Sequence, residues 1–123
     1  MIKYLLMLFV VTILLSGCAT LNEKPDPFVG QWKFQFSNLR QGDPNAILAI
    51  SKEAGVYSGT ITNSNGEYGL TDLLIEAGNS LTANFQYQGY SVAFNAQFDG
   101  NTISGQSNVN NRTFSFAGER MEQ

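Results

Sequence analysis

The chain has 123 residues, which suits one small domain, and it carries 7 Lys and Arg against 10 Asp and Glu, for a formal charge of −3. A weakly acidic chain without a basic cluster does not predict nucleic-acid binding, because that affinity depends on Lys and Arg that neutralise phosphates. With no His and one Cys, a single chain also lacks the residues for a Cys/His zinc site or for Ser-His-Asp and Cys-His catalysis. We therefore expect no metal, no cofactor and no enzyme activity.

The first residues have the pattern of an export signal. Lys3 makes the start positive, and residues 5–15 (LLMLFVVTILL) form an apolar run that is too short to cross a membrane core of about 30 Å. Leu15, the last residue of this run, begins the letters LSGC, which end in Gly17 and Cys18. This segment resembles the lipobox of bacterial lipoproteins. The resemblance implies a signal peptide over residues 1–17, cleavage between Gly17 and Cys18, diacylglycerol on the Cys18 thiol, and a fatty acid such as palmitate on the new amino end. The alternative is an uncleaved apolar anchor.

The lipobox resemblance also implies a location in the bacterial cell envelope, where the protein is attached to the membrane through its N-terminal lipid. Ala19 follows the cysteine, whereas Asp at that position tends to retain enterobacterial lipoproteins in the inner membrane, so the outer membrane is favoured. Cys18 is the only cysteine, which excludes an intrachain disulfide. Residues 18–29 contain Pro25 and Pro27 and no apolar periodicity, so we expect the lipidated Cys and a spacer before a domain over residues 30–123.

From Gly30 on, apolar and polar residues alternate with the period of two that is typical of strands with one buried face. Short links such as Asn65-Gly66 and Asp99-Gly100 have the composition of tight turns. The pattern predicts eight strands, over Gly30–Asn38, Ala46–Lys52, Gly55–Thr62, Glu67–Glu76, Ser80–Tyr87, Tyr90–Phe98, Asn101–Ser107 and Arg112–Arg120.

Short links between successive strands predict antiparallel hairpins and an up-and-down meander. Closing such a sheet removes its exposed edges and encloses the apolar face of every strand. The predicted fold class is therefore all-β, an eight-stranded antiparallel up-and-down β-barrel. An open two-layer sandwich and a membrane-spanning barrel, whose apolar face would point outward, are the alternatives.

A closed meander pairs its first strand with its last, which brings Trp32 close to Arg120. We expect the indole to face inward and the guanidinium to lie over it, as a cation–π contact. Gly30-Gln31-Trp32 resembles the Gly-x-Trp motif of the calycins, the lipocalin and avidin-like barrels, and Arg120 resembles the Arg that packs on that Trp. The resemblance covers Gly30–Arg120 and implies a calycin-like barrel that is closed by Gly30, Trp32 and Arg120.

The inward aromatic residues are the candidate ligand contacts. They either line a space for a small apolar or amphipathic molecule or simply fill the barrel, and an eight-stranded interior permits both. These candidate ligand-binding residues are Phe34, Phe36, Phe85, Tyr87, Tyr90, Phe94, Phe114 and Phe116.

A second hypothesis is a barrel scaffold that binds an envelope protein or inhibits an envelope enzyme. Tyr87 and Tyr90 flank the Gln88-Gly89 turn at one open end and are the candidates for such a contact. For an enzyme, only scattered carboxylates are available. Asp72 and Glu76 share one parity in the predicted strand Glu67–Glu76, but both faces of that strand are partly apolar, so its inward face stays unassigned.

Overall fold

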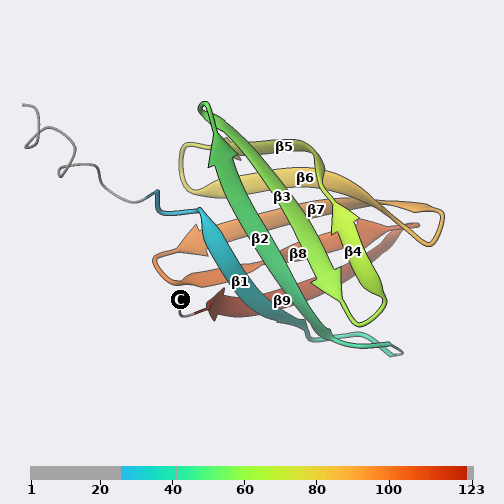
Figure 1. Cartoon of the computed structure of the whole chain (residues 1–123). Coiled ribbons are helices and arrows are strands. Elements are labelled where there is room, and N and C mark those ends of the chain that lie inside the picture. Colours follow the sequence, from blue (N-terminus) through green and yellow to red (C-terminus); the bar gives the residue numbers. More distant parts are fainter. Residues whose placement is uncertain (1–25, 41, 122–123) are drawn as a thin grey trace, which may run out of the picture.

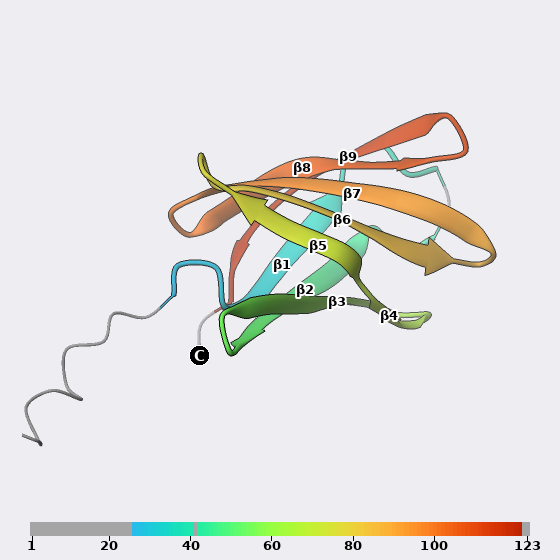
Figure 2. The same ribbon diagram turned by 90° about the horizontal axis from the view of Figure 1, so that it is seen from above.

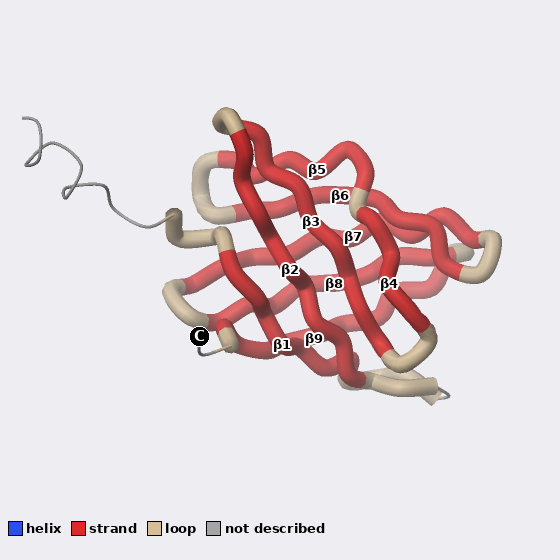
Figure 3. The backbone as a smooth tube through the Cα atoms, in the orientation of Figure 1, coloured by secondary structure: helices blue, strands red, loops and turns tan. Residues whose placement is uncertain are grey.

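The computed structural model describes residues 26–40 and 42–121. The predicted signal peptide, the Gly17–Cys18 cleavage site, the lipid attachment at Cys18 and most of the spacer lie outside these residues. The described chain consists of strands joined by short loops (Figure 3). Across both described ranges, no helix has the length and apolar character needed to cross a membrane.

Nine antiparallel strands form one sheet that curls into a nearly closed barrel (Figures 1 and 2). The strand order is β4-β3-β2-β1-β9-β8-β7-β6-β5, so the first strand pairs with the last. This arrangement confirms the all-β, up-and-down antiparallel barrel and excludes the two-layer sandwich. The strands are β1 (Gly30–Phe36), β2 (Asn45–Glu53), β3 (Val56–Asn63), β4 (Gly66–Gly69), β5 (Thr71–Glu76), β6 (Ser80–Tyr87), β7 (Tyr90–Asp99), β8 (Thr102–Val109) and β9 (Arg112–Arg120).

The prediction of eight strands is wrong at one place. The segment Glu67–Glu76 is two strands, because β4 pairs with β3 at one edge of the sheet while β5 pairs with β6 at the other. Leu70 alone connects them, and its N–H donates to the carbonyl of Gly59 at 2.9 Å. The chain therefore crosses here from one edge of the sheet to the other.

The alternation of side chains also changes in this segment. Asp72 has a φ of 53°, and the register of β5 on β6 shifts between Thr71 and Leu74. An extra residue of this kind moves the following side chains to the opposite face. As a result Tyr68 and Leu70 are half-buried before the shift, and the half-buried residues after it are Leu73 and Ile75. Asp72 and Glu76 are exposed, so they form no buried acidic pair.

Side chains close the seam between the two edges of the sheet. A Cβ atom at Gly59 would lie 3.1 Å from Leu70 Cδ1 and 3.2 Å from Leu73 Cδ1, so both leucines pack directly on this backbone. A larger residue at position 59 would require the leucine side chains to shift by a few tenths of an ångström. The seam is therefore sealed mainly by apolar contacts rather than by a hydrogen-bonded ladder.

Aromatic rings fill the middle of the barrel. The Phe94 and Phe116 rings are stacked with centroids 4.9 Å apart, and Phe34 lies 4.6 Å from Phe116. Gly105 and Gly118 leave room for this packing, since a Cβ at Gly105 would lie 2.8 Å from Phe116 Cζ. Close packing of this kind is typical of a filled protein core. The largest fully buried side chains are Trp32, Phe34, Leu48, Leu81, Phe94 and Ile103.

Candidate functional site

One end of the barrel is closed by the contact between the first and last strands. Trp32 lies opposite Arg120 in the β1–β9 ladder, and the guanidinium carbon lies 4.3 Å from the centre of the indole. The guanidinium also donates to the carbonyls of Val29, at 2.8 Å, and Pro27. Trp32 Nε1 donates to the carbonyl of Phe28 at 3.0 Å. The indole N–H and both terminal guanidinium nitrogens therefore have partners in the segment before β1.

A carboxylate holds the same segment against the barrel. Asp26 accepts hydrogen bonds from the Tyr57 hydroxyl at 2.6 Å, from Lys52 Nζ at 3.3 Å and from the Phe28 N–H at 2.8 Å. We call Asp26, Lys52 and Tyr57 the Asp26 cluster. The Phe28 ring packs on Phe98, with centroids 5.2 Å apart. The described end of the expected spacer, residues 26–29, thus covers this end of the barrel.

The protonation of the Asp26 cluster follows from these contacts. Partial burial acts to raise the pKa of Asp26, but the hydrogen bonds from Tyr57, Phe28 and Lys52 outweigh it and hold the pKa below its usual value. The hydrogen bond to Asp26 raises the pKa of Tyr57 and that of Lys52. At neutral pH the cluster therefore consists of a carboxylate, a phenol and an ammonium group.

The opposite end of the barrel holds a pocket with a volume of about 230 Å³, which we call the mouth pocket. It lies where β1, β6 and β8 end and where β7 and β9 begin. Its lining is mostly apolar, as is usual for sites that bind small molecules. The residues around it are Phe36, Leu39, Gly42, Asp43, Asn45, Ala46, Ile61, Asn63, Tyr68, Phe85, Tyr87, Val92, Ser107, Val109 and Phe114.

The structure brings half of the sequence-predicted ligand contacts together at the mouth pocket. Its lining includes Phe36, Phe85, Tyr87 and Phe114. The other candidates lie elsewhere. Tyr90 projects into solvent, with 54% of its surface exposed, because it starts β7 directly after the turn at Gln88-Gly89. The remaining three belong to the packed core below the pocket and are Phe34, Phe94 and Phe116.

The rim of the mouth pocket carries aromatic and acidic groups. The Tyr68 and Tyr87 rings lie 5.0 Å apart, and Asn65 Nδ2 donates to the Tyr87 hydroxyl at 2.9 Å. The N–H of Asn45, at 3.0 Å, and its side-chain amide, at 3.1 Å, donate to Asp43 and hold the pKa of that carboxyl below its usual value. Asp43 is therefore ionised at neutral pH. It is the one charged residue among the described residues that line the pocket.

Sequence reasoning missed one polar residue inside the mouth pocket. Ser107 lies on the inward face of β8, opposite Phe94 of β7 and Phe114 of β9. It is 4% exposed, and its Oγ atom has no hydrogen-bond partner among the described residues. Buried polar atoms in folded proteins nearly always have such a partner. The sequence did carry one signal, a serine at an inward position among apolar residues. Alternation alone, however, does not show whether such a serine is buried or marks the end of the strand.

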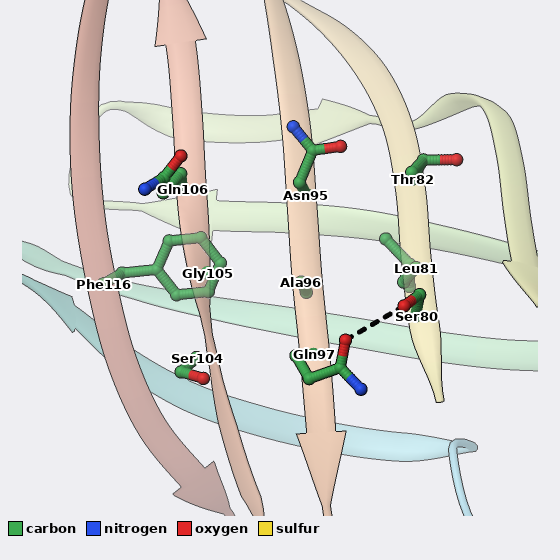
Figure 4. Close-up of a pocket in the computed structure, with 10 residues that line it drawn as sticks. All are labelled: Ser80, Leu81, Thr82, Asn95, Ala96, Gln97, Ser104, Gly105, Gln106 and Phe116. Carbon is green, nitrogen blue, oxygen red and sulfur yellow. Dashed lines mark hydrogen bonds between the residues drawn. The ribbon is translucent and has the colours of Figure 1, made fainter. Parts of the chain in front are cut away.

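A second hollow, of about 500 Å³, lies open on the outer face of β6, β7, β8 and β9 (Figure 4). The exposed side chains around it are neutral and polar, and some bond to one another, as in the 2.9 Å contact from Ser80 Oγ to Gln97 Oε1. This is the composition of a hydrated sheet surface, so the mouth pocket is the better-defined candidate site. The residues that line the outer hollow are Ser80, Leu81, Thr82, Asn95, Ala96, Gln97, Ser104, Gly105, Gln106 and Phe116.

Two further results bear on the chemistry. Within residues 26–40 and 42–121, no three or more His, Cys, Asp or Glu side chains come together as a group that could hold a metal ion. A scan against protein-family models finds no match, and a search of curated proteins finds no relative. The geometry of the mouth pocket is therefore the observation from which a function can be argued.

Proposed function

We propose that this protein is a lipid-anchored binding protein of the bacterial cell envelope and that its mouth pocket takes a small apolar or amphipathic molecule. One observation carries the proposal, namely an apolar pocket of about 230 Å³ with aromatic walls above a packed core. Ligand sites combine such apolar walls with a few placed polar groups. Asp43 and Ser107 are polar groups of this kind, and the described lining has no His, Cys or Lys to complete a catalytic set, so binding is favoured over catalysis.

The size of the mouth pocket limits the ligand. Pockets for drug-sized molecules have volumes of about 300–1,000 Å³, whereas this one has about 230 Å³. It suits a single ring or a short chain, or one end of a longer molecule whose remainder stays outside.

The anchor and the relation to the calycins are part of the same proposal. The letters LSGC before Ala19 support lipidation of Cys18 and an envelope location, with the outer membrane favoured. The Gly30-Gln31-Trp32 segment and the 4.3 Å contact of Arg120 with Trp32 support a calycin-like barrel. Replacing Cys18→Ser should abolish labelling by a radioactive fatty acid and leave unprocessed precursor, and persistent labelling would refute the anchor.

Titration with toluene tests binding in the mouth pocket. The lipidated protein in nanodiscs should show shifts of the Tyr87 and Phe114 ring resonances, which report on the protein and not on toluene dissolved in the membrane. Val109→Trp should fill the pocket and remove the shifts. Ser91→Trp, an exposed change on β7 near the same end, is the matched control and should bind as the wild type does. Equal binding by Val109→Trp would contradict the proposal.

The alternative function, a scaffold for an envelope protein, has one specific observation in its favour. Tyr90 is a large side chain that is exposed beside the Gln88-Gly89 turn. If a protein partner docks there, Tyr90→Ala should lose a partner that wild-type protein captures from envelope extracts, while toluene binding stays unchanged. If Tyr90→Ala captures the same proteins as wild type, this observation no longer supports a scaffold role.

A further inference from the structure

We propose that the mouth pocket selects uncharged molecules with a hydrogen-bonding group, such as a hydroxyl, and holds that group against Ser107 Oγ while the apolar body lies among the rings nearer the rim. This inference rests on the proposed function, since it names the chemical class of the ligand and the way in which it enters.

The first step is the hydroxyl of Ser107. It is buried at an inward position of β8, one inward position below Val109, and it lacks a partner within the described chain. Its neighbours across the two ladders are Phe94 and Phe114, whose side chains offer no hydrogen-bonding atom. A buried hydroxyl that can both donate and accept is stabilised by a ligand group that does either. Ser107 also lines the mouth pocket, and its Oγ atom is closed to solvent in this structure, so a ligand group contacts it after a side chain of the lining shifts.

The second step is the charge of the site. Asp43 is the one ionised residue in the lining, and the other titratable side chains there are the phenols Tyr68 and Tyr87. Arg40 and Arg112 are exposed and lie outside the lining. A carboxylate placed at Ser107 would be buried among phenyl rings without a cation, and it would have to pass the negative rim. An ammonium group at the same depth would also lose its hydration, and the one counter-charge of the lining, Asp43, belongs to the loop before β2, so we expect the group at Ser107 to be uncharged.

The third step is the position of the apolar body. With its polar group at Ser107, a small ligand lies beside Phe114 and extends toward Tyr87 and Val109, which belong to the same lining. Aromatic walls of this kind pack well against a ring or a short alkyl chain. The pocket thus has one polar group, the Ser107 hydroxyl, at its inner end and apolar walls between that group and the rim.

Three probes of one shape test this inference, namely toluene, benzyl alcohol and benzoate, titrated into the lipidated full-length protein in nanodiscs. Wild type should bind benzyl alcohol about threefold to tenfold more tightly than toluene, which is the range expected for one net hydrogen bond. Benzoate should not bind. Ser107→Ala should remove the preference for benzyl alcohol and retain toluene binding. Ser115→Ala, the same chemical change on the outward face of β9, should leave both affinities unchanged.

The outcomes separate this inference from the proposed function. If toluene and benzyl alcohol bind equally to wild type, or if the preference survives in Ser107→Ala, Ser107 does not hold the ligand and the inference is wrong while the pocket remains a binding site. If benzoate binds as tightly as benzyl alcohol, the exclusion of anions is wrong. If no probe shifts the Tyr87 and Phe114 resonances, the proposed function fails, and the inference with it. A thermal melt of Ser107→Ala shows whether that variant is folded, and Ser107→Cys provides a second variant that keeps the shape of the side chain, with a slightly larger atom, but weakens the hydrogen bond.

Discussion

The two ends of the barrel differ in whether their buried polar groups have hydrogen-bond partners. At the closed end, the Arg120 guanidinium, the Trp32 indole N–H and the Asp26 carboxylate all have partners at hydrogen-bond distance. At the mouth, Ser107 is buried and its Oγ atom has no such partner within residues 26–40 and 42–121. The paired groups at the closed end stabilise the fold, and their hydrogen-bonding atoms are already occupied by the chain itself. The difference is what we expect if contacts at the closed end stabilise the fold and the proposed binding site lies at the mouth.

The sharpest test of this division removes one aromatic ring at each end. Trp32→Ala empties a fully buried site and removes the surface on which Arg120 lies, so we expect a loss of about 3–5 kcal/mol in the free energy of unfolding. Phe114→Ala at the half-buried mouth should cost clearly less, because part of that ring already faces the pocket. Urea denaturation measures both, with exposed Lys33→Ala as the control. Equal losses at the two ends would contradict the comparison.

The next effect concerns the cation at the closed end. Arg120→Met keeps much of the side-chain volume but removes the cation–π contact and the hydrogen bonds to Val29 and Pro27. We expect a loss of about 2 kcal/mol in unfolding free energy, from one cation–π contact and two charge-assisted bonds that are partly exposed. Toluene binding at the mouth should be unchanged. A variant as stable as wild type would show that the ladder between β1 and β9 closes the barrel without this contact.

A smaller, pH-dependent effect should come from the Asp26 cluster. The pKa of Asp26 is lowered on folding, so its stabilising contribution is present above the unfolded value near 3.8 and is lost as the pH falls through the lower folded value. The pKa of Tyr57 is raised, so its contribution is present below its usual 10.0 and is lost as the pH rises through the higher folded value. Asp26→Asn should cost about 1 kcal/mol near neutral pH.

The measurement is the difference in unfolding free energy between wild type and Asp26→Asn across the pH range. It should be constant around neutral pH and shrink in acid below about pH 4, since wild type then loses the charge that the variant lacks. Asp99→Asn, an exposed change at the end of β7, is the control for a general charge effect. A difference that persists unchanged to pH 2 would show that the carboxylate does not stabilise the fold through its charge.

The sequence predicted the closed end better than the mouth, and the reason is physical. Alternation along single strands, together with the rule that neighbours pair, is enough to bring Trp32 opposite Arg120. The split of Glu67–Glu76 is different, because the positive φ of Asp72 reverses the alternation without a glycine to indicate it. The contact between Asp26 and Tyr57 joins residues 31 apart in the chain and has no local pattern.

The sequence also predicted only one aspect of the candidate site, namely which side chains face inward. Inward parity identifies aromatic residues such as Phe34 and Phe114, but it does not say at which height along the barrel each ring lies. That height depends on the register between strands, which places Phe34 in the packed core and Phe114 at the mouth. Ser107 depends on register most of all, since only its neighbours on β7 and β9 show that its hydroxyl is buried.

The smallest expected effect on stability has the opposite sign from the others. Ser107→Ala removes a buried hydroxyl that has no partner in the described chain, so the unfolding free energy should stay equal or rise by up to about 1 kcal/mol. Ser80→Ala, which breaks the 2.9 Å contact with Gln97 on the outer face, should not stabilise the protein. Thermal melts without ligand compare the two variants. A clear loss of stability in Ser107→Ala would mean that the hydroxyl already has a stabilising partner in the folded protein. The two ends of the barrel would then no longer differ in the hydrogen bonding of their buried polar groups.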